Sequence, residues 1–181
     1  MSSLIATVIR WSEQLAQVSG SVLVDNNYVD TDLIEDHTLV LLTPKTLDVP
    51  HIRIFVTNKS IGFSVENRDR LSERVGFKSP SKPDLVGAYL ESNLTTTHKT
   101  MDMIDDLVAG KFTLTVKSCC QKISATAIIF ENGVSVPGPS TTLAFISYLG
   151  MGSFVELGYK SWLSNGSSKE LMPMRSFAAK K

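Results

Sequence analysis

The chain of 181 residues contains only two cysteines, three histidines and no excess of either charge. Cys119 and Cys120 are neighbours, and a disulfide between adjacent residues is geometrically strained. Because no third cysteine exists, the sequence predicts two free thiols, as is usual in a reducing compartment. Equal numbers of acidic and basic residues also argue against a general nucleic-acid binder with a uniformly basic surface.

Long hydrophobic runs are absent as well. No run approaches the roughly 18 residues that a transmembrane helix needs. The first residues lack the positively charged segment that precedes the hydrophobic part of a secretory signal peptide. The expected location is therefore the cytoplasm, or the host cytoplasm and the virion if the protein is viral.

Catalytic and metal-binding signatures are also missing. His37, His51 and His98 have no second ligand type at metal-binding spacing. Residues 25–36 are acidic but lack the glycine and the ligand spacing of a calcium loop, and residues 150–153 lack the third glycine and the lysine of phosphate loops. We therefore expect no catalytic residue, metal or cofactor. A small enzyme that uses Cys119 or Cys120 with a distant histidine remains the alternative.

The composition indicates one folded domain, with 43% hydrophobic and 20% charged residues. Hydrophobic residues alternate through residues 111–130, which predicts two strands folded back on each other, with the connection at 118–122. A second hairpin is predicted at 51–65, with its tip at Asn58 and Lys59. The same pattern predicts further strands at residues 21–24, 37–43, 141–149 and 154–157.

Three helices are expected from spacings of three and four residues. The first covers residues 3–19 and has a narrow hydrophobic face, formed by Leu4, Val8, Trp11 and Leu15. A central pair is predicted at 83–94 and 99–109, and Gly110 ends the second of these helices. Three aspartates of this helix are expected on a solvated face, namely Asp102, Asp105 and Asp106.

These elements predict an α+β fold, with mainly antiparallel sheets and hairpins packed against an N-terminal helix and a central pair of helices. Residues 1–20 form the helix, which docks on its own domain, reaches another copy or contacts a lipid surface. Residues 21–163 form a single α+β domain, with Tyr159 and Trp162 anchoring its end. Residues 164–181 are expected to be a flexible basic tail.

Charge is arranged in blocks of alternating sign along the chain. Residues 1–50 carry seven acids and two bases, whereas residues 51–83 carry three acids and seven bases. Such blocks favour a homo-oligomer in which unlike patches meet. The hydrophobic face of the first helix is the candidate self-association surface. Candidate contacts for an anionic partner are Arg68, Arg70, Arg74, Lys78, Lys82, Lys180 and Lys181.

Two segments, KFTLTVKSC at residues 111–119 and TLAFISYLGMGS at 142–153, resemble strands of rhabdovirus-type matrix proteins of negative-strand RNA viruses. The resemblance implies a non-enzymatic protein that self-associates beneath a lipid envelope and contacts both the nucleocapsid and the membrane surface. The chain departs from the family in two places. Its N-terminus is an amphipathic helix instead of a lysine-rich segment, and residues 137–140 read PGPS instead of a budding motif.

The sequence therefore predicts a structural, self-assembling, matrix-like protein. The alternative is a viral accessory module, such as a silencing suppressor or movement factor, that binds RNA or a host protein. It would use the same basic residues together with aromatic stacking.

Overall fold

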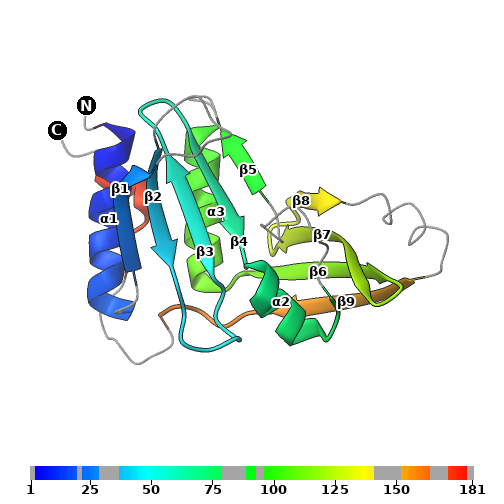
Figure 1. Ribbon diagram of the computed structural model, residues 1–181. Coiled ribbons are helices and arrows are strands. Elements are labelled where there is room, and N and C mark those ends of the chain that lie inside the picture. Colours follow the sequence, from blue (N-terminus) through cyan, green and yellow to red (C-terminus); the bar gives the residue numbers. More distant parts are fainter. Residues whose placement is uncertain are drawn as a thin grey trace.

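The computed structural model describes residues 3–19, 22–28, 37–78, 89–92, 96–140, 152–163 and 171–178, which form helices packed against two antiparallel sheets (Figure 1). This arrangement confirms the predicted α+β class. The first sheet has the strand order β1-β2-β3-β4-β5. Its strands are β1 (Val22–Tyr28), β2 (His37–Leu42), β3 (Ile52–Val56), β4 (Ile61–Val65) and β5 (Tyr89–Ser92).

The second sheet has the order β8-β7-β6-β9 and projects sideways from the rest of the molecule (Figure 1). The predicted ribbon at residues 111–130 is confirmed as the β6–β7 hairpin, but only Cys120 and Gln121 separate its strands. Both have positive φ, 53° and 60°, which is the backbone pattern of a type I′ turn. The strands are β6 (Phe112–Cys119), β7 (Lys122–Phe130), β8 (Ser135–Ser140) and β9 (Gly152–Gly158).

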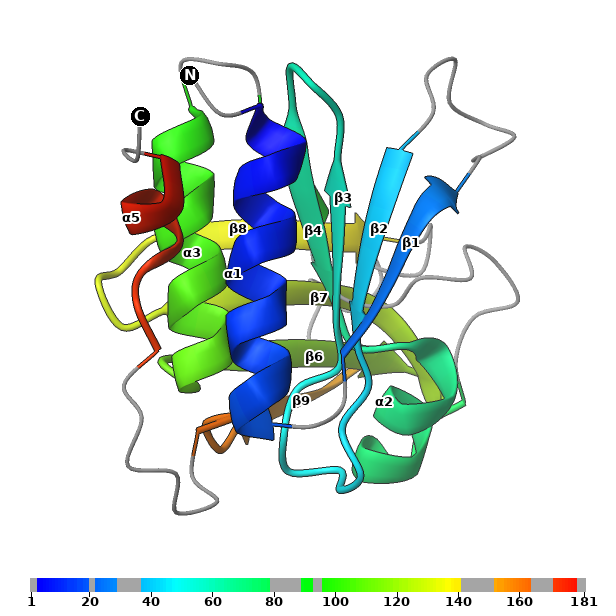
Figure 2. The same ribbon diagram turned by 90° about the vertical axis from the view of Figure 1, so that its left-hand side faces the viewer.

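Helices α1 (Leu4–Ser19) and α3 (Thr97–Ala109) lie side by side over one face of the first sheet (Figure 2). The short helix α5 (Met174–Ala178) packs against both of them. Helix α2 (Arg68–Val75) follows β4 directly. It begins where the Asn67 side chain accepts a hydrogen bond from the Arg70 amide.

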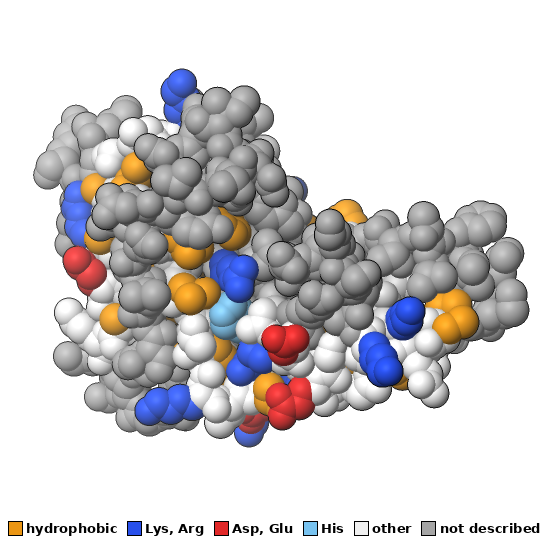
Figure 3. Space-filling view, in the orientation of Figure 1, with side chains coloured by type: hydrophobic (Ala, Val, Ile, Leu, Met, Phe, Trp, Pro, Cys, Tyr) orange, Lys and Arg blue, Asp and Glu red, His pale blue; other side chains and the backbone are white. Residues whose placement is uncertain are grey.

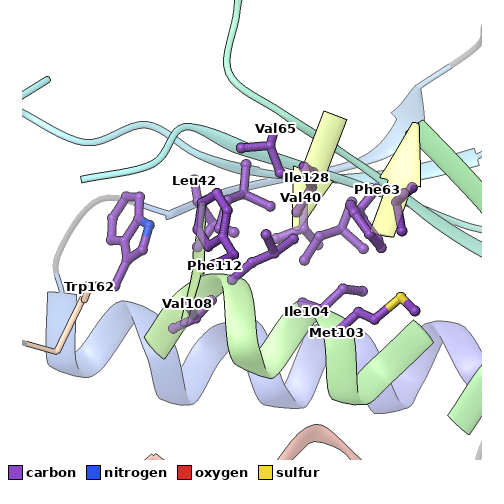
Figure 4. Packing of buried hydrophobic residues seen from close by; sticks show 14 of the residues in the cluster. Val40, Leu42, Phe63, Val65, Met103, Ile104, Val108, Phe112, Ile128 and Trp162 are labelled. Atoms are coloured by element: carbon purple, nitrogen blue, oxygen red, sulfur yellow. The ribbon is translucent and has the colours of Figure 1, made fainter. Parts of the chain in front are cut away.

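The hydrophobic core lies between these helices and the inner faces of both sheets (Figure 4). Phe63 of β4, Ile104 of α3 and Ile128 of β7 belong to one cluster and are all fully buried. Phe112 and Trp162 join the same cluster. The two sheets therefore share a single core.

Two anchors from the predicted end of this domain are confirmed. Trp162 is buried, and its indole Nε1–H donates to the carbonyl of Pro50 at 2.9 Å. The Tyr159 ring stacks on Phe112 with centroids 4.9 Å apart. Gly110 ends α3 with φ 74°, also as predicted.

The helix predicted at residues 83–94 is wrong at Tyr89–Ser92. These four residues form β5, in which Leu90 pairs with Phe63 of β4. Pairing with β4 therefore outweighs the local helical spacing. The rest of that prediction, and the strand predicted at residues 141–149, lie outside the described residues.

The predicted flexible tail is wrong for Met174–Ala178, which forms α5. Met174 is fully buried in the core, so hydrophobic burial holds this segment in place. Residues 137–140 contain two prolines and a glycine, which usually interrupt a strand, but they belong to β8. Proline is tolerated there because β8 lies at the edge of the described strands, where one side of the backbone needs no partner from them. None of the described helices is long and hydrophobic enough to cross a bilayer.

Candidate functional site

The candidate self-association face of the N-terminal helix is used inside the molecule. Val8, Trp11 and Leu15 are fully buried in the core, and Leu4 packs against it half-buried. The assignment of these residues to contacts with another copy is therefore corrected: α1 docks on its own domain, where it removes hydrophobic surface from water.

A carboxylate locks this docking. Asp105 of α3 accepts hydrogen bonds from the Trp11 Nε1–H at 3.1 Å and from the Met174 amide at 2.9 Å. It thereby ties α1 and α5 to α3, and the prediction of a solvated face is wrong for Asp105. Burial raises its pKa to about 6, against the opposing effect of these donors. Asp102 is exposed, as predicted, and pairs with Arg175 of α5.

Two of the residues predicted to contact an anionic partner form hydrogen bonds within the molecule instead. The Arg70 guanidinium donates to the carbonyl oxygens of Thr46 at 2.8 Å and Val49 at 3.0 Å. Its Nε–H also donates to the Glu66 carboxylate at 3.3 Å, and Glu66 is fully buried. Arg70 is therefore the internal counter-ion of a buried acid. This assignment corrects its predicted role as a surface contact.

Arg74 is held in a similar way. Its guanidinium lies 4.2 Å from the centre of the Tyr159 ring and donates to the carbonyl of Gly158 at 3.0 Å. Of the other predicted contacts, Lys78 is exposed. Arg68 belongs to α2, but its side chain is not described, and Lys82, Lys180 and Lys181 lie outside the described residues.

The buried residue His51 lies next to Glu66. The His51 amide donates to the Glu66 carboxylate at 3.1 Å, and the Glu66 amide donates back to the His51 carbonyl at 2.7 Å. Burial is the main reason why the pKa of His51 falls to about 4 and why that of Glu66 rises. His51 is therefore neutral at pH 7, and the pair fastens the start of β3 to the end of β4.

The outer face of the second sheet carries exposed hydrophobic side chains. We use this name for the side chains that point away from the core on the four strands. One rung across the sheet joins Ala125, Lys117 and Phe154, and the next joins Pro137, Ala127, Thr115 and Glu156. Two large hydrophobic side chains are exposed on this face, Phe154 at 55% and Ile129 at 40%.

This face is hollowed. Ala125 and Ala127 have short side chains, and they lie among the larger Ile129, Pro137 and Phe154. The result is an open hollow of about 380 Å³ with Lys117 in its lining. The described lining includes no histidine, cysteine or carboxylate. Its chemistry therefore suits the binding of a hydrophobic group with an anionic neighbour better than proton transfer.

Basic residues gather near the same end of the sheet. Lys78 and Lys122 are both exposed, and their backbones form an isolated parallel bridge beside the hairpin tip. Figure 3 shows basic and hydrophobic side chains close together on the projecting part of the molecule. Of this group, sequence reasoning found only Lys78. The paired alanines in a strand of larger residues are the signal that could have revealed the hollow.

Among the described residues, no three histidine, cysteine, aspartate or glutamate side chains cluster. Comparison of the chain with protein-family models, curated proteins and solved structures gives no match.

Proposed function

We propose that this protein is a non-enzymatic structural protein that assembles with further copies of itself, in the manner of matrix-like proteins. The observation that carries the proposal is the outer face of the second sheet, where Phe154 is 55% exposed beside a hollow. Exposed large hydrophobic groups next to a concave surface are typical of protein contacts.

The edges and charges of the second sheet support this proposal. Prolines in β8 make one edge a poor partner for another strand, whereas β9 has none and forms the opposite edge of the described strands. Lys117 and Glu156 lie on adjacent rungs of the outer face. A second copy placed with an offset can therefore bring unlike charges together.

Light scattering over a range of protein and salt concentrations tests self-assembly. We expect association of the wild-type protein and at least a tenfold loss of affinity in Phe154→Asp, because a charge replaces a phenyl group that the contact between copies buries (~1.5–3 kcal/mol). The matched control is Met172→Asp, since Met172 is similarly exposed at 39% but lies outside the second sheet. A protein that stays monomeric from low to high salt at high concentration contradicts the proposal.

A second candidate function is binding of an anionic partner, such as RNA or an acidic host protein. It is supported by Lys78, Lys117 and Lys122, which lie near one another at the hairpin end of the second sheet. Binding of labelled single-stranded RNA should weaken in Lys117→Ala/Lys122→Ala and remain unchanged in Lys59→Ala, an exposed lysine of the first sheet's hairpin. Absence of RNA binding, or binding that is insensitive to salt, removes the RNA version.

A further inference from the structure

The tip of the β6–β7 hairpin holds two thiols side by side. Cys119, the last residue of β6, is 2% exposed, whereas Cys120, the first residue of the turn, is exposed. Their sulfur atoms are 3.6 Å apart. Neighbouring side chains of a regular strand point to opposite faces, so this proximity comes from the left-handed backbone of Cys120, with φ 53°.

The turn is built from residues that rarely adopt its geometry. Both central positions of a type I′ turn need positive φ, which favours Asn and Gly, yet here they are Cys120 and Gln121. Backbone bonds hold the conformation: the Lys78 amide donates to the Gln121 carbonyl at 2.9 Å, and the Ile123 amide donates to the Lys78 carbonyl at 3.0 Å. The paired thiols thus lie on a strained but well-tethered turn, and backbone strain of this kind is concentrated at functional sites.

We propose that Cys119 and Cys120 form a dithiol site that binds one soft, thiophilic metalloid or metal centre through both sulfurs, with trivalent arsenic as the representative ligand. Soft thiolate ligands select soft centres. With an organic arsenoxide, two As–S bonds form and two S–H bonds break, and the oxygen leaves as water with both thiol protons. Arsenic stays trivalent, so the step needs no oxidant or reductant.

Accessibility sets the order of the two bonds. Cys120 is exposed and reacts first. Cys119 is poorly reactive alone because a hydrogen bond to Cys120 and burial raise the pKa of its thiol. Once the centre is attached to Cys120, its reaction with Cys119 is intramolecular and gains the advantage of proximity.

A bridging centre fits this pair better than a direct disulfide. Consecutive Cα atoms are about 3.8 Å apart across a trans peptide, which is shorter than the usual range of about 4.4–6.8 Å in disulfides. A bridging atom lengthens the ring and relieves that strain. The described residues supply no third histidine, cysteine or carboxylate ligand nearby. The site therefore suits a metal or metalloid atom that needs only two sulfur ligands from the protein, and it does not suit tetrahedral zinc.

Titration with phenylarsine oxide tests the site on the full-length reduced protein, followed by intact mass and by counting the remaining thiols. We expect one arsenical per chain, loss of both thiols, and an adduct that survives excess monothiol but is removed by a dithiol. Cys120→Ser and Cys119→Ser should each lose the monothiol-resistant adduct, with at least a hundredfold weaker binding. Circular dichroism checks that both variants fold, and the exposed Cys120 makes Cys120→Ser the safer one.

N-Ethylmaleimide, which reacts with one thiol at a time, provides the reagent control and should label Cys120 much faster than Cys119. Three results overturn the proposal: two arsenicals per chain, no adduct, or a monothiol-resistant adduct in either single variant. The site is independent of self-assembly, so a monomeric protein would leave it unaffected.

Discussion

Strand β4 in the first sheet and strand β9 in the second both pair in antiparallel fashion but have very different surroundings. All five residues of β4 are buried, whereas five of the seven residues of β9 are exposed and only Val155 and Leu157 are half-buried. β4 lies between two other strands and next to the helices, while β9 has one strand partner among the described strands. A local pattern can therefore predict a strand. Whether both faces of that strand are buried, or one face stays exposed, depends on the strands and helices that pack against it.

The largest effect should come from matched truncations of phenylalanine in these two strands. Phe63→Ala removes a fully buried ring of β4 and should lower the free energy of unfolding by ~3–5 kcal/mol. Phe154→Ala removes a ring that is 55% exposed and should change it by less than about 0.5 kcal/mol. Urea unfolding measures both. A similar loss in the two variants would show that Phe154 belongs to the core.

The next effect concerns the buried ion pair beside the first sheet. Arg70→Met leaves the Glu66 carboxylate buried without its counter-ion and should cost about 3 kcal/mol in urea unfolding. Adding Glu66→Gln should recover part of that loss. Lys160→Met breaks the exposed pair with Asp48 and should leave stability almost unchanged, because water and salt screen such pairs. Equal losses in Arg70→Met and Lys160→Met would contradict the internal role of Arg70.

The connection from α3 into the second sheet gives a slightly smaller effect. Gly110→Ala should cost about 2–3 kcal/mol in all, because φ is 74° and the new Cβ would lie 2.9 Å from backbone atoms of Tyr159 and Lys160. Gly76 has a similar φ of 71°, but nothing lies within 4 Å of an added Cβ. Gly76→Ala should therefore cost only about 1 kcal/mol. If thermal unfolding shows equal losses of stability in the two variants, the close backbone contacts at Gly110 do not contribute to the cost of the substitution.

The smallest effects are two opposing dependences on pH. His51 has a folded pKa of about 4, below the ordinary histidine value of 6.5, so its contribution to stability is lost as pH falls from 6.5 toward 4. Asp105 has a folded pKa of about 6, above 3.8, so its contribution is full below pH 3.8 and is lost as pH rises through 6. The raised pKa of Glu66 acts in the same direction as that of Asp105.

Single variants should separate these two contributions. His51→Gln should become less stable as pH rises from 4 to 6, whereas Asp105→Asn should become less stable as pH falls over the same range. Each trend should be on the order of 1–2 kcal/mol. Urea midpoints at several pH values measure them, and identical profiles in both variants would refute the assignment of the two groups.

Local patterns were sufficient for much of the fold. The hairpins β3–β4 and β6–β7 follow from alternation, and the positions of α1 and α3 follow from helical spacing and from Gly110. Elements that depend on distant partners were not found in this way. Tyr89–Ser92 has helical spacing but pairs with β4, and Met174 is buried by helices that lie far from it in the sequence.

The candidate site was harder to predict for the same reason. Charge counts identified Arg70 and Arg74 as surface contacts, but both are engaged by groups brought close by the fold, among them the Val49 carbonyl and the Tyr159 ring. The hollow depends on the register that places Ala125 and Ala127 between Pro137 and Phe154. No local pattern contains that register. The adjacency of Cys119 and Cys120 was visible, but the approach of their sulfurs depends on the backbone of the turn.

The bond between Met174 and Asp105 joins residues 69 positions apart, and α5 packs on α1 from the other end of the chain. During synthesis on the ribosome, the environment of Trp11 therefore stays incomplete until α5 has emerged. Local units such as the β3–β4 hairpin can form earlier, because their contacts are close in sequence. The indole side of α1 is therefore completed by a contact that is distant in sequence and not by its own neighbours.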